Sequence, residues 1–148
     1  WRQYEKTAKR TSAIQTSVSD ALKKIASMNI ALSQSNADVG DMDNRLGTLR
    51  SSILEMDAAL VGNRSKMGPG EKNNPTVGDR LFVVQRVIEY STYGPTETAL
   101  ETLQLVRKDL DKIENQLIDN NKDLDALARR LEKAGAPWIE GTPIPKKN

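Results

Sequence analysis

Apolar residues recur along most of this chain at alternating intervals of three and four residues, and no other feature constrains the fold as strongly. The first stretch keeps the pattern without interruption at Tyr4, Thr7, Thr11, Ile14, Val18, Ala21, Ile25, Met28 and Leu32. An α-helix turns once in 3.6 residues, so these positions line one face of a helix. A strand alternates with a period of two and does not produce this spacing. The stretch therefore predicts a long amphipathic helix that buries one stripe.

Three further stretches have helical spacing. The second contains Val39, Met42, Leu46, Leu49, Ile53, Met56 and Leu60, and the fourth contains Leu103, Val106, Leu110, Ile113, Leu117, Asn120, Leu124, Leu127 and Leu131. The third is shorter, with Leu81, Val84, Val87 and Ile88, and its β-branched residues leave a strand over 81–88 as the alternative. The expected fold is all-α, an antiparallel bundle of three long helices and one shorter helix.

Capping residues predict where these helices begin and end. Thr76 and Asp79 have the spacing of a capping box, and Thr96, or Pro95 at the first helical position, begins the fourth helix. Gly135 is expected to end that helix in the left-handed conformation. The domain division that follows is a helical bundle over 1–134 and an extended, proline-containing tail over 135–148.

The segments between the helices are polar or rich in glycine and proline. Residues 33–38 form a break with Asn36 or Asp38 as candidate N-cap, and Gly62 is a candidate C-cap. Residues 63–77 form the one long loop. In the tail, Pro137 prevents further helix, and we expect Trp138 to fold back onto the bundle.

Polar and charged residues indicate how the helices pair. Asn120 occupies a seam position, where a single Asn commonly fixes register; a polar contact to the long loop is the alternative. The first helix carries six basic residues against two acidic ones, and the second, over 38–62, carries five acidic residues against two basic ones. This opposition favours a hairpin of the first two helices, although chance imbalance between two solvated faces explains it equally well.

Composition excludes several classes of chemistry. The chain has no histidine and no cysteine, which removes disulfides, thiolate or imidazole metal sites, and serine–histidine or cysteine–histidine catalysis. The carboxylate pairs Asp41/Asp43 and Asp109/Asp111 are two residues apart and point to different helix faces. We therefore expect no catalytic residue, no cofactor and no metal in this segment.

Charge and hydropathy also bound the partners. The net charge is +2 and aromatic residues make up 4%, so the chain lacks the basic footprint of a nucleic-acid-binding protein. No apolar run approaches the ~20 residues that span a bilayer. Tyr90, Tyr93 and Trp138 are the candidate interaction residues; near helix ends such residues usually cap a core, and a platform for a sugar or peptide is the functional alternative.

The second half of the chain carries motifs that resemble a known family. They are Asn63-Arg64 at a helix end, Asn74–Arg80 (Asn-Pro-Thr-Val-Gly-Asp-Arg), Tyr90–Thr98 (Tyr-Ser-Thr-Tyr-Gly-Pro-Thr-Glu-Thr) and Leu131–Trp138 (Leu-Glu-Lys-Ala-Gly-Ala-Pro-Trp). Together they resemble the C-terminal helical region of bacterial exported proteins with sortilin-like or BNR-repeat β-propellers, often labelled glycosyl hydrolases. The resemblance covers roughly 46–141, and residues 65–72 depart from the pattern.

The resemblance implies a secreted or periplasmic protein in which this bundle is appended to a propeller that carries any glycosidase chemistry. The absence of a starting Met before Trp1 likewise suggests a fragment or processed product. The implied function is a non-catalytic structural or protein-interaction domain, whose partner is the β-propeller domain of the same polypeptide or another copy of it, as in a homodimer. The alternatives are a helical subdomain that completes the sugar-binding site of a BNR-repeat glycosyl hydrolase, and a stand-alone coiled-coil adaptor or sensor bundle.

Overall fold

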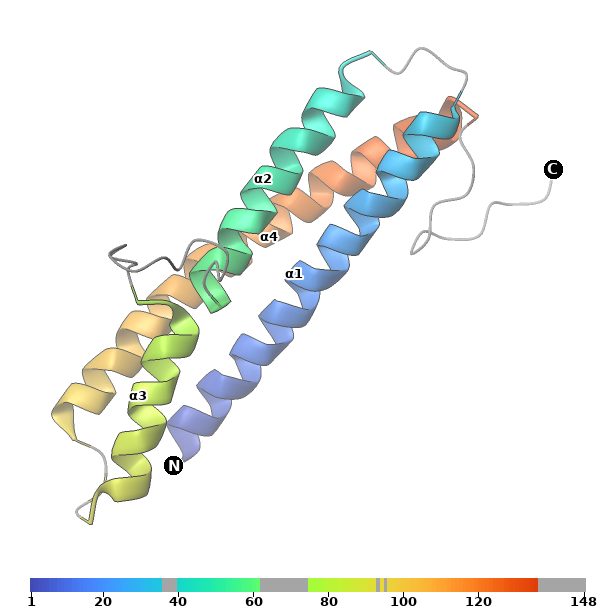
Figure 1. The fold of residues 1–148 in the computed structure, drawn as a ribbon. Helices are drawn as coiled ribbons and strands as arrows, with labels where there is room; N and C mark the ends of the chain where they lie inside the picture. The colour runs from blue at the N-terminus through green and yellow to red at the C-terminus, as the bar shows by residue number, and fades with distance from the viewer. Residues whose placement is uncertain (36–39, 62–74, 93, 95, 136–148) are drawn as a thin grey trace, which may run out of the picture. The chain divides into compact units, whose positions relative to one another are not determined.

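The computed structural model describes residues 1–35, 40–61, 75–92, 94 and 96–135. These ranges contain four α-helices and no strand: α1 (Arg2–Gln34), α2 (Met42–Val61), α3 (Val77–Tyr90) and α4 (Glu97–Lys133) (Figure 1). The all-α bundle of three long helices and one shorter helix is confirmed. The strand alternative for 81–88 is wrong, because α3 buries residues at helical spacing.

The observed helix boundaries follow from the predicted caps. The backbone N–H of Asp79 donates to Thr76 Oγ1, and the N–H of Thr76 donates to Asp79 Oδ2, each at 3.0 Å, which completes the capping box of α3. Thr96 Oγ1 accepts from the N–H of Ala99 at 3.1 Å at the start of α4. Gly135 has φ +81° two residues after the end of α4. The other boundary candidates (Asn36, Asp38, Gly62, Pro95, Pro137) and Trp138 lie outside the described residues, as do most of the long loop and the tail beyond Gly135.

The helices contribute to two compact units. Unit 1 comprises Trp1–Ser17 and Glu55–Asn115, and unit 2 comprises Val18–Leu54 and Gln116–Asn148. Each unit has its own set of buried residues. The long seams of α1 and α4 contribute buried residues to both units. The predicted division at residue 134 stays a prediction.

Unit 1 packs the first half of α1, the end of α2, α3 and the first half of α4 around one core. Its buried residues are Thr7, Thr11, Ile14, Met56, Leu60, Val77, Leu81, Val84, Ala99, Leu103, Val106, Leu110 and Ile113. Within this unit α1 and α4 run in the same direction and α3 runs opposite to both (Figure 1). The buried hydroxyls of Thr7 and Thr11 donate to the carbonyls of Gln3 and Thr7, each at 2.8 Å, so the helix itself satisfies them.

Unit 2 contains the rest of α1, most of α2 and the rest of α4. Its buried residues are Val18, Ala21, Ile25, Met28, Ala31, Met42, Leu46, Leu49, Ile53, Leu117, Leu124, Leu127, Ala128 and Leu131. Here α2 runs antiparallel to α1 and α4 (Figure 1). The expected antiparallel order therefore holds for the third helix of each unit, whereas α1 and α4 are parallel. The spacing of the seam residues does not predict whether two helices pack parallel or antiparallel, because it shows only which face of a helix is apolar.

Ion pairs connect α1 to α4 and not to α2. Arg10 contacts Asp111 at 2.6 Å and Glu114 at 2.5 Å in unit 1, and Lys24 pairs with Asp125 in unit 2. In the described ranges no ion pair joins α1 to α2. The basic side chains of α1 that form ion pairs thus meet carboxylates of α4, while the antiparallel packing of α1 and α2 in unit 2 agrees with the predicted hairpin.

Candidate interaction surface

Helix α3 carries two seams on opposite sides. The inner seam (Val77, Leu81, Val84, Ile88) faces the core of unit 1, with Val77, Leu81 and Val84 buried and Ile88 half-buried. The residues of this inner seam are four, three and four positions apart. A second set with the same spacing begins two residues later and consists of Asp79, Val83, Arg86 and Tyr90. A shift of two residues rotates a helical position by about 200°, so the second seam points away from the core. We call these four residues together with Phe82 the outer face of α3.

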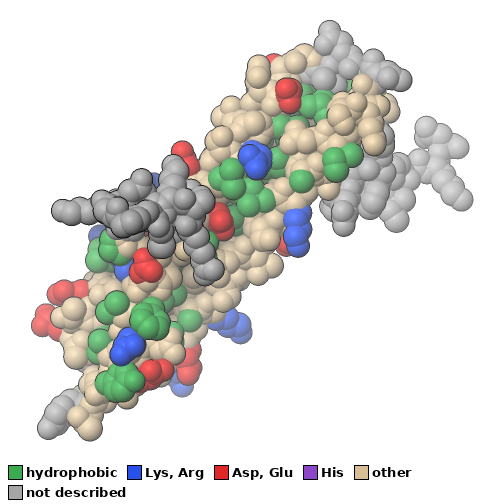
Figure 2. Space-filling model, viewed as in Figure 1, with side chains coloured by type: hydrophobic (Ala, Val, Ile, Leu, Met, Phe, Trp, Pro, Cys, Tyr) green, Lys and Arg blue, Asp and Glu red, His purple; other side chains and the backbone are tan. Residues whose placement is uncertain are grey.

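The outer face is exposed although much of it is apolar. Phe82 is 57% exposed, Val83 54% and Tyr90 77%. Figure 2 shows hydrophobic side chains gathered over α3, interrupted by basic and acidic ones. Single exposed apolar residues are ordinary, but an apolar group on one side of a single helix is a candidate interaction surface.

Arg86 orders the aromatic side chains of this face. Its guanidinium carbon lies 5.6 Å from the centroid of the Phe82 ring and 5.5 Å from that of the Tyr90 ring. The spacing of four residues on either side places both rings next to the cation on the helix surface. Each cation–π contact at an exposed site stabilises by about 0.5–1 kcal/mol. Phe82, Arg86 and Tyr90 therefore form a partly preorganised stripe along α3.

Among the described residues, the charges around the stripe leave Arg86 without an acidic partner. No carboxylate in the described part of the chain forms an ion pair with Arg86. Glu89 instead accepts a hydrogen bond from Gln85 Nε2 at 3.0 Å, and one oxygen of Asp79 is used in the capping box. Asp79 is itself exposed, so the outer face presents a carboxylate near its N-terminal end and a guanidinium near its C-terminal end.

Contacts with the neighbouring helices hold α3 in this orientation. Arg80 Nη1 contacts Asp109 Oδ2 of α4 at 3.2 Å, and the hydroxyl of Tyr4 in α1 donates to Gln85 Oε1 at 3.3 Å. At its start α3 approaches the end of α2 so closely that a Cβ on Gly78 would lie 3.2 Å from the carbonyl oxygen of Leu60. These contacts fix which side of α3 faces solvent.

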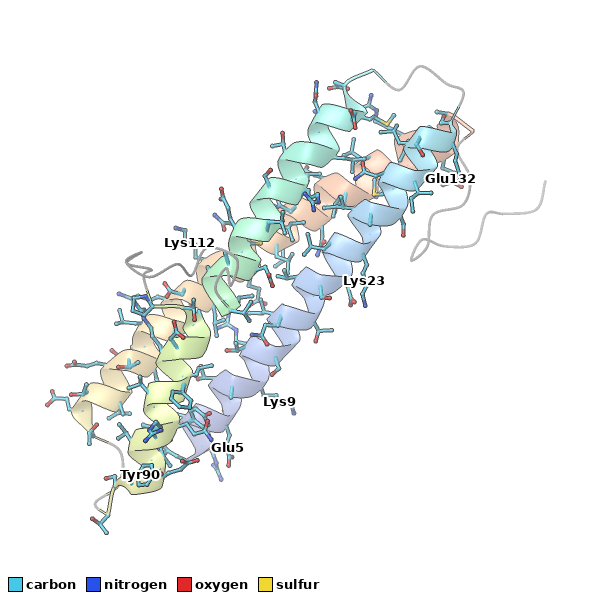
Figure 3. All side chains as sticks on the ribbon, viewed as in Figure 1. Glu5, Lys9, Lys23, Tyr90, Lys112 and Glu132 are labelled. Atoms are coloured by element: carbon cyan, nitrogen blue, oxygen red, sulfur yellow. The ribbon has the colours of Figure 1, made fainter. Side chains whose placement is uncertain are left out.

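Of the three predicted interaction residues, the structure describes one. Tyr90 lies at the C-terminal end of α3 on its outer face (Figure 3). Tyr93 and Trp138 lie outside the described residues. Sequence reasoning missed Phe82, Val83 and Arg86 as members of the same surface. The signal was present, because the outer seam repeats the spacing of the inner one two residues later.

Three of the four carboxylates in the aspartate pairs of the sequence form ion pairs with arginine side chains. Asp41, Asp109 and Asp111, which we considered as catalytic carboxylates, form ion pairs with Arg45 and Arg130, with Arg80 and with Arg10 respectively. Hydrogen bonds to Glu114 and then to Asp111 raise the pKa of the Arg10 guanidinium. A group whose pKa is raised in the folded state stabilises the fold at pH values below its unfolded pKa, and this contribution is lost only as pH rises through its folded pKa, so Arg10 contributes throughout the neutral range.

The described ranges contain neither a metal-binding cluster nor a membrane-spanning helix. They contain no group of three acidic, histidine or cysteine residues with the geometry of a metal site. None of the helices α1 to α4 is long and apolar enough to cross a bilayer.

Comparison with known proteins adds no relative. No protein-family model matches the chain, and neither a curated protein nor a solved structure shows significant similarity to it. The resemblance to the helical region of propeller proteins is therefore carried by the motifs of the chain alone.

Proposed function

We propose that this chain is a non-catalytic protein-interaction domain whose recognition surface is the outer face of α3. The observation that carries the proposal is the exposed stripe of Phe82, Arg86 and Tyr90 on the side of α3 opposite the core. Aromatic residues and arginine are enriched at protein interfaces and contribute most of the energy there. The cation–π contacts already restrict these side chains, so less conformational entropy is lost when a partner binds.

The motif resemblance supports the proposal that this domain is part of a longer polypeptide. We place it beside a β-propeller of the same polypeptide, in a secreted or periplasmic protein, where it pairs the polypeptide with another protein or another copy. Two of the motifs, 74–80 and 90–98, flank α3, so the resemblance and the outer face involve the same part of the chain.

Oxidative footprinting tests whether a protein covers this face. The natural full-length polypeptide, in concentrated extract, and the purified chain, at high dilution, are each exposed to a pulse of hydroxyl radicals. We expect the oxidation rates of Phe82 and Tyr90 to fall several-fold in the extract. Leu105, which is 48% exposed on α4, is the matched control and should keep its rate.

Equal oxidation of Phe82 and Tyr90 in both samples would contradict the proposed function. A fall that includes Leu105 to the same extent would show general shielding and would also count against the outer face as the specific surface.

A further inference from the structure

The charge pattern of the outer face identifies its occupant. Resting on the proposed function, we infer that the outer face of α3 binds the same face of a second copy of this chain, with the two α3 helices antiparallel about a two-fold axis. The axis passes between Phe82 and Val83.

The outer face is self-complementary under this symmetry. Asp79 precedes the midpoint of Phe82 and Val83 by the same number of residues by which Arg86 follows it. An antiparallel pair centred there places Asp79 of one copy opposite Arg86 of the other, twice by symmetry. Phe82 of each copy then packs on Val83 of the second copy. The Arg86 guanidinium, which has no acidic partner among the described residues, thereby gains one.

Two other pairings of the same two faces are unfavourable. A parallel pair brings every residue next to its own copy, so Asp79 meets Asp79 and Arg86 meets Arg86. An antiparallel pair centred on Arg86 places the two guanidinium groups side by side. Like charges in contact oppose association and opposite charges select register, so electrostatics favours the axis between Phe82 and Val83.

The proposed contact between the two α3 helices is small, so its test needs a high protein concentration. Helix α3 has 14 residues and is roughly 21 Å long, so the contact falls short of the ~800 Å² per partner of a stable interface. We expect a weak dimer that forms as concentration rises.

Charge reversal with sedimentation analysis tests the register. The purified chain is examined over a concentration series that extends to about 1 mM, together with Arg86→Glu and Asp79→Lys. Each reversal replaces two attractive contacts of the dimer by two repulsive ones and should lower the association constant about tenfold or more. An equimolar mixture of the two variants restores both contacts in a heterodimer and should return to within about threefold of the wild-type constant.

Matched controls separate this effect from net charge and from folding. Lys112→Glu and Glu101→Lys make the same charge changes at exposed positions of α4 and should leave association unchanged. Asp79→Lys removes half of the capping box and can destabilise α3. A second measurement therefore avoids this variant. The chain has no cysteine, so Val83→Cys introduces a single thiol beside the axis. Under mild oxidation it should form a disulfide-linked dimer much faster than Leu105→Cys.

The inference is overturned by a wild-type chain that stays monomeric, with Val83→Cys no faster than Leu105→Cys. It is also overturned by a wild-type dimer whose constant neither reversal changes. Failure of the inference is separable from failure of the proposed function: if Phe82 and Tyr90 are protected in the extract but the chain does not self-associate, a different protein occupies the face.

Discussion

Leucines in the same helix differ widely in how much of the side chain is buried. On α4, Leu110 is fully buried in unit 1, whereas Leu105, five residues earlier, is 48% exposed. The three-four spacing includes the first and excludes the second. Substitution of the two leucines therefore measures whether the seam determines stability.

We predict that Leu110→Ala lowers the free energy of unfolding by about 2–5 kcal/mol, because it removes buried methyl groups and leaves a cavity. Leu105→Ala should change it by less than about 0.5 kcal/mol. Urea denaturation followed by circular dichroism gives both values. Equal effects of the two substitutions would show that the seam is wrongly assigned.

Asn120 is the polar member of the α4 seam. It is half-buried, and its Nδ2 donates to Ser52 Oγ of α2 at 3.0 Å. This contact joins two antiparallel helices of unit 2, which agrees with a role in register. The alternative contact to the long loop involves residues 63–74, which lie outside the described ranges.

A double-mutant cycle of Ser52→Ala and Asn120→Ala should give a coupling energy of about 0.5–1.5 kcal/mol, the usual net value of one hydrogen bond. The same cycle with the exposed neighbour Ser51→Ala in place of Ser52→Ala should give a coupling near zero. Equal coupling energies in the two cycles would show that the hydrogen bond between Asn120 and Ser52 does not help to set the register of the two helices.

At the scale of the element, glycines act through backbone conformation. Gly47 lies inside α2 and Gly135 follows α4 with φ +81°, and a Cβ on either would meet no atom within 4 Å. Space is therefore equal at the two positions and only the backbone dihedral differs. The same substitution at both isolates the conformational effect.

Gly47→Ala should raise the free energy of unfolding by about 0.5–1 kcal/mol, because alanine is the better helix former. Gly135→Ala should lower it by about 1 kcal/mol, because an L residue is strained at positive φ. Thermal denaturation of the two variants beside the wild type checks the signs. A shift of the same sign for both would rule out the left-handed end of α4.

At the scale of the whole molecule, two compact units share continuous helices and long aliphatic seams. Each core is closed by a third helix antiparallel to α1 and α4, namely α2 in unit 2 and α3 in unit 1. The outer face of α3 is exposed because no described helix packs against it. In the described part of the chain, the surface that we propose for a partner is therefore a helix face.

We predict that the purified chain binds Zn²⁺ no more tightly than a generic acidic surface and does not hydrolyse simple glycosides, because it has neither histidine nor cysteine. Isothermal titration calorimetry and chromogenic glycosides test the two statements. Lys9→His with Ala13→His, one turn apart on exposed positions of α1, is the positive control and should create measurable zinc affinity. Tight zinc binding by the unmodified chain, or repeatable glycoside turnover that a single carboxylate substitution abolishes, would refute the prediction.

The sequence by itself determined the helices, their inner faces and the starts of α3 and α4, but it began α2 too early, because Gly40 at φ +57° and Asp41 precede the observed start at Met42. Spacing identified the buried seams from Thr7 to Met28 and from Met42 to Leu60, and the capping residues Thr76 and Thr96 located two helix starts. This succeeded because amphipathic period and caps are local properties: each depends on side chains within one or two turns.

Only the tertiary structure decided which helices are neighbours and which faces stay free. It made α1 and α4 parallel, moved the ion pairs of Arg10 and Lys24 to α4, and left Phe82, Arg86 and Tyr90 in solvent. A seam specifies that a face is buried but not what covers it, and long-range charge pairs depend on the direction of the partner helix. The spacing had already assigned Leu81, Val84 and Ile88 to the inner face of α3, and only packing showed that no described helix covers the opposite face.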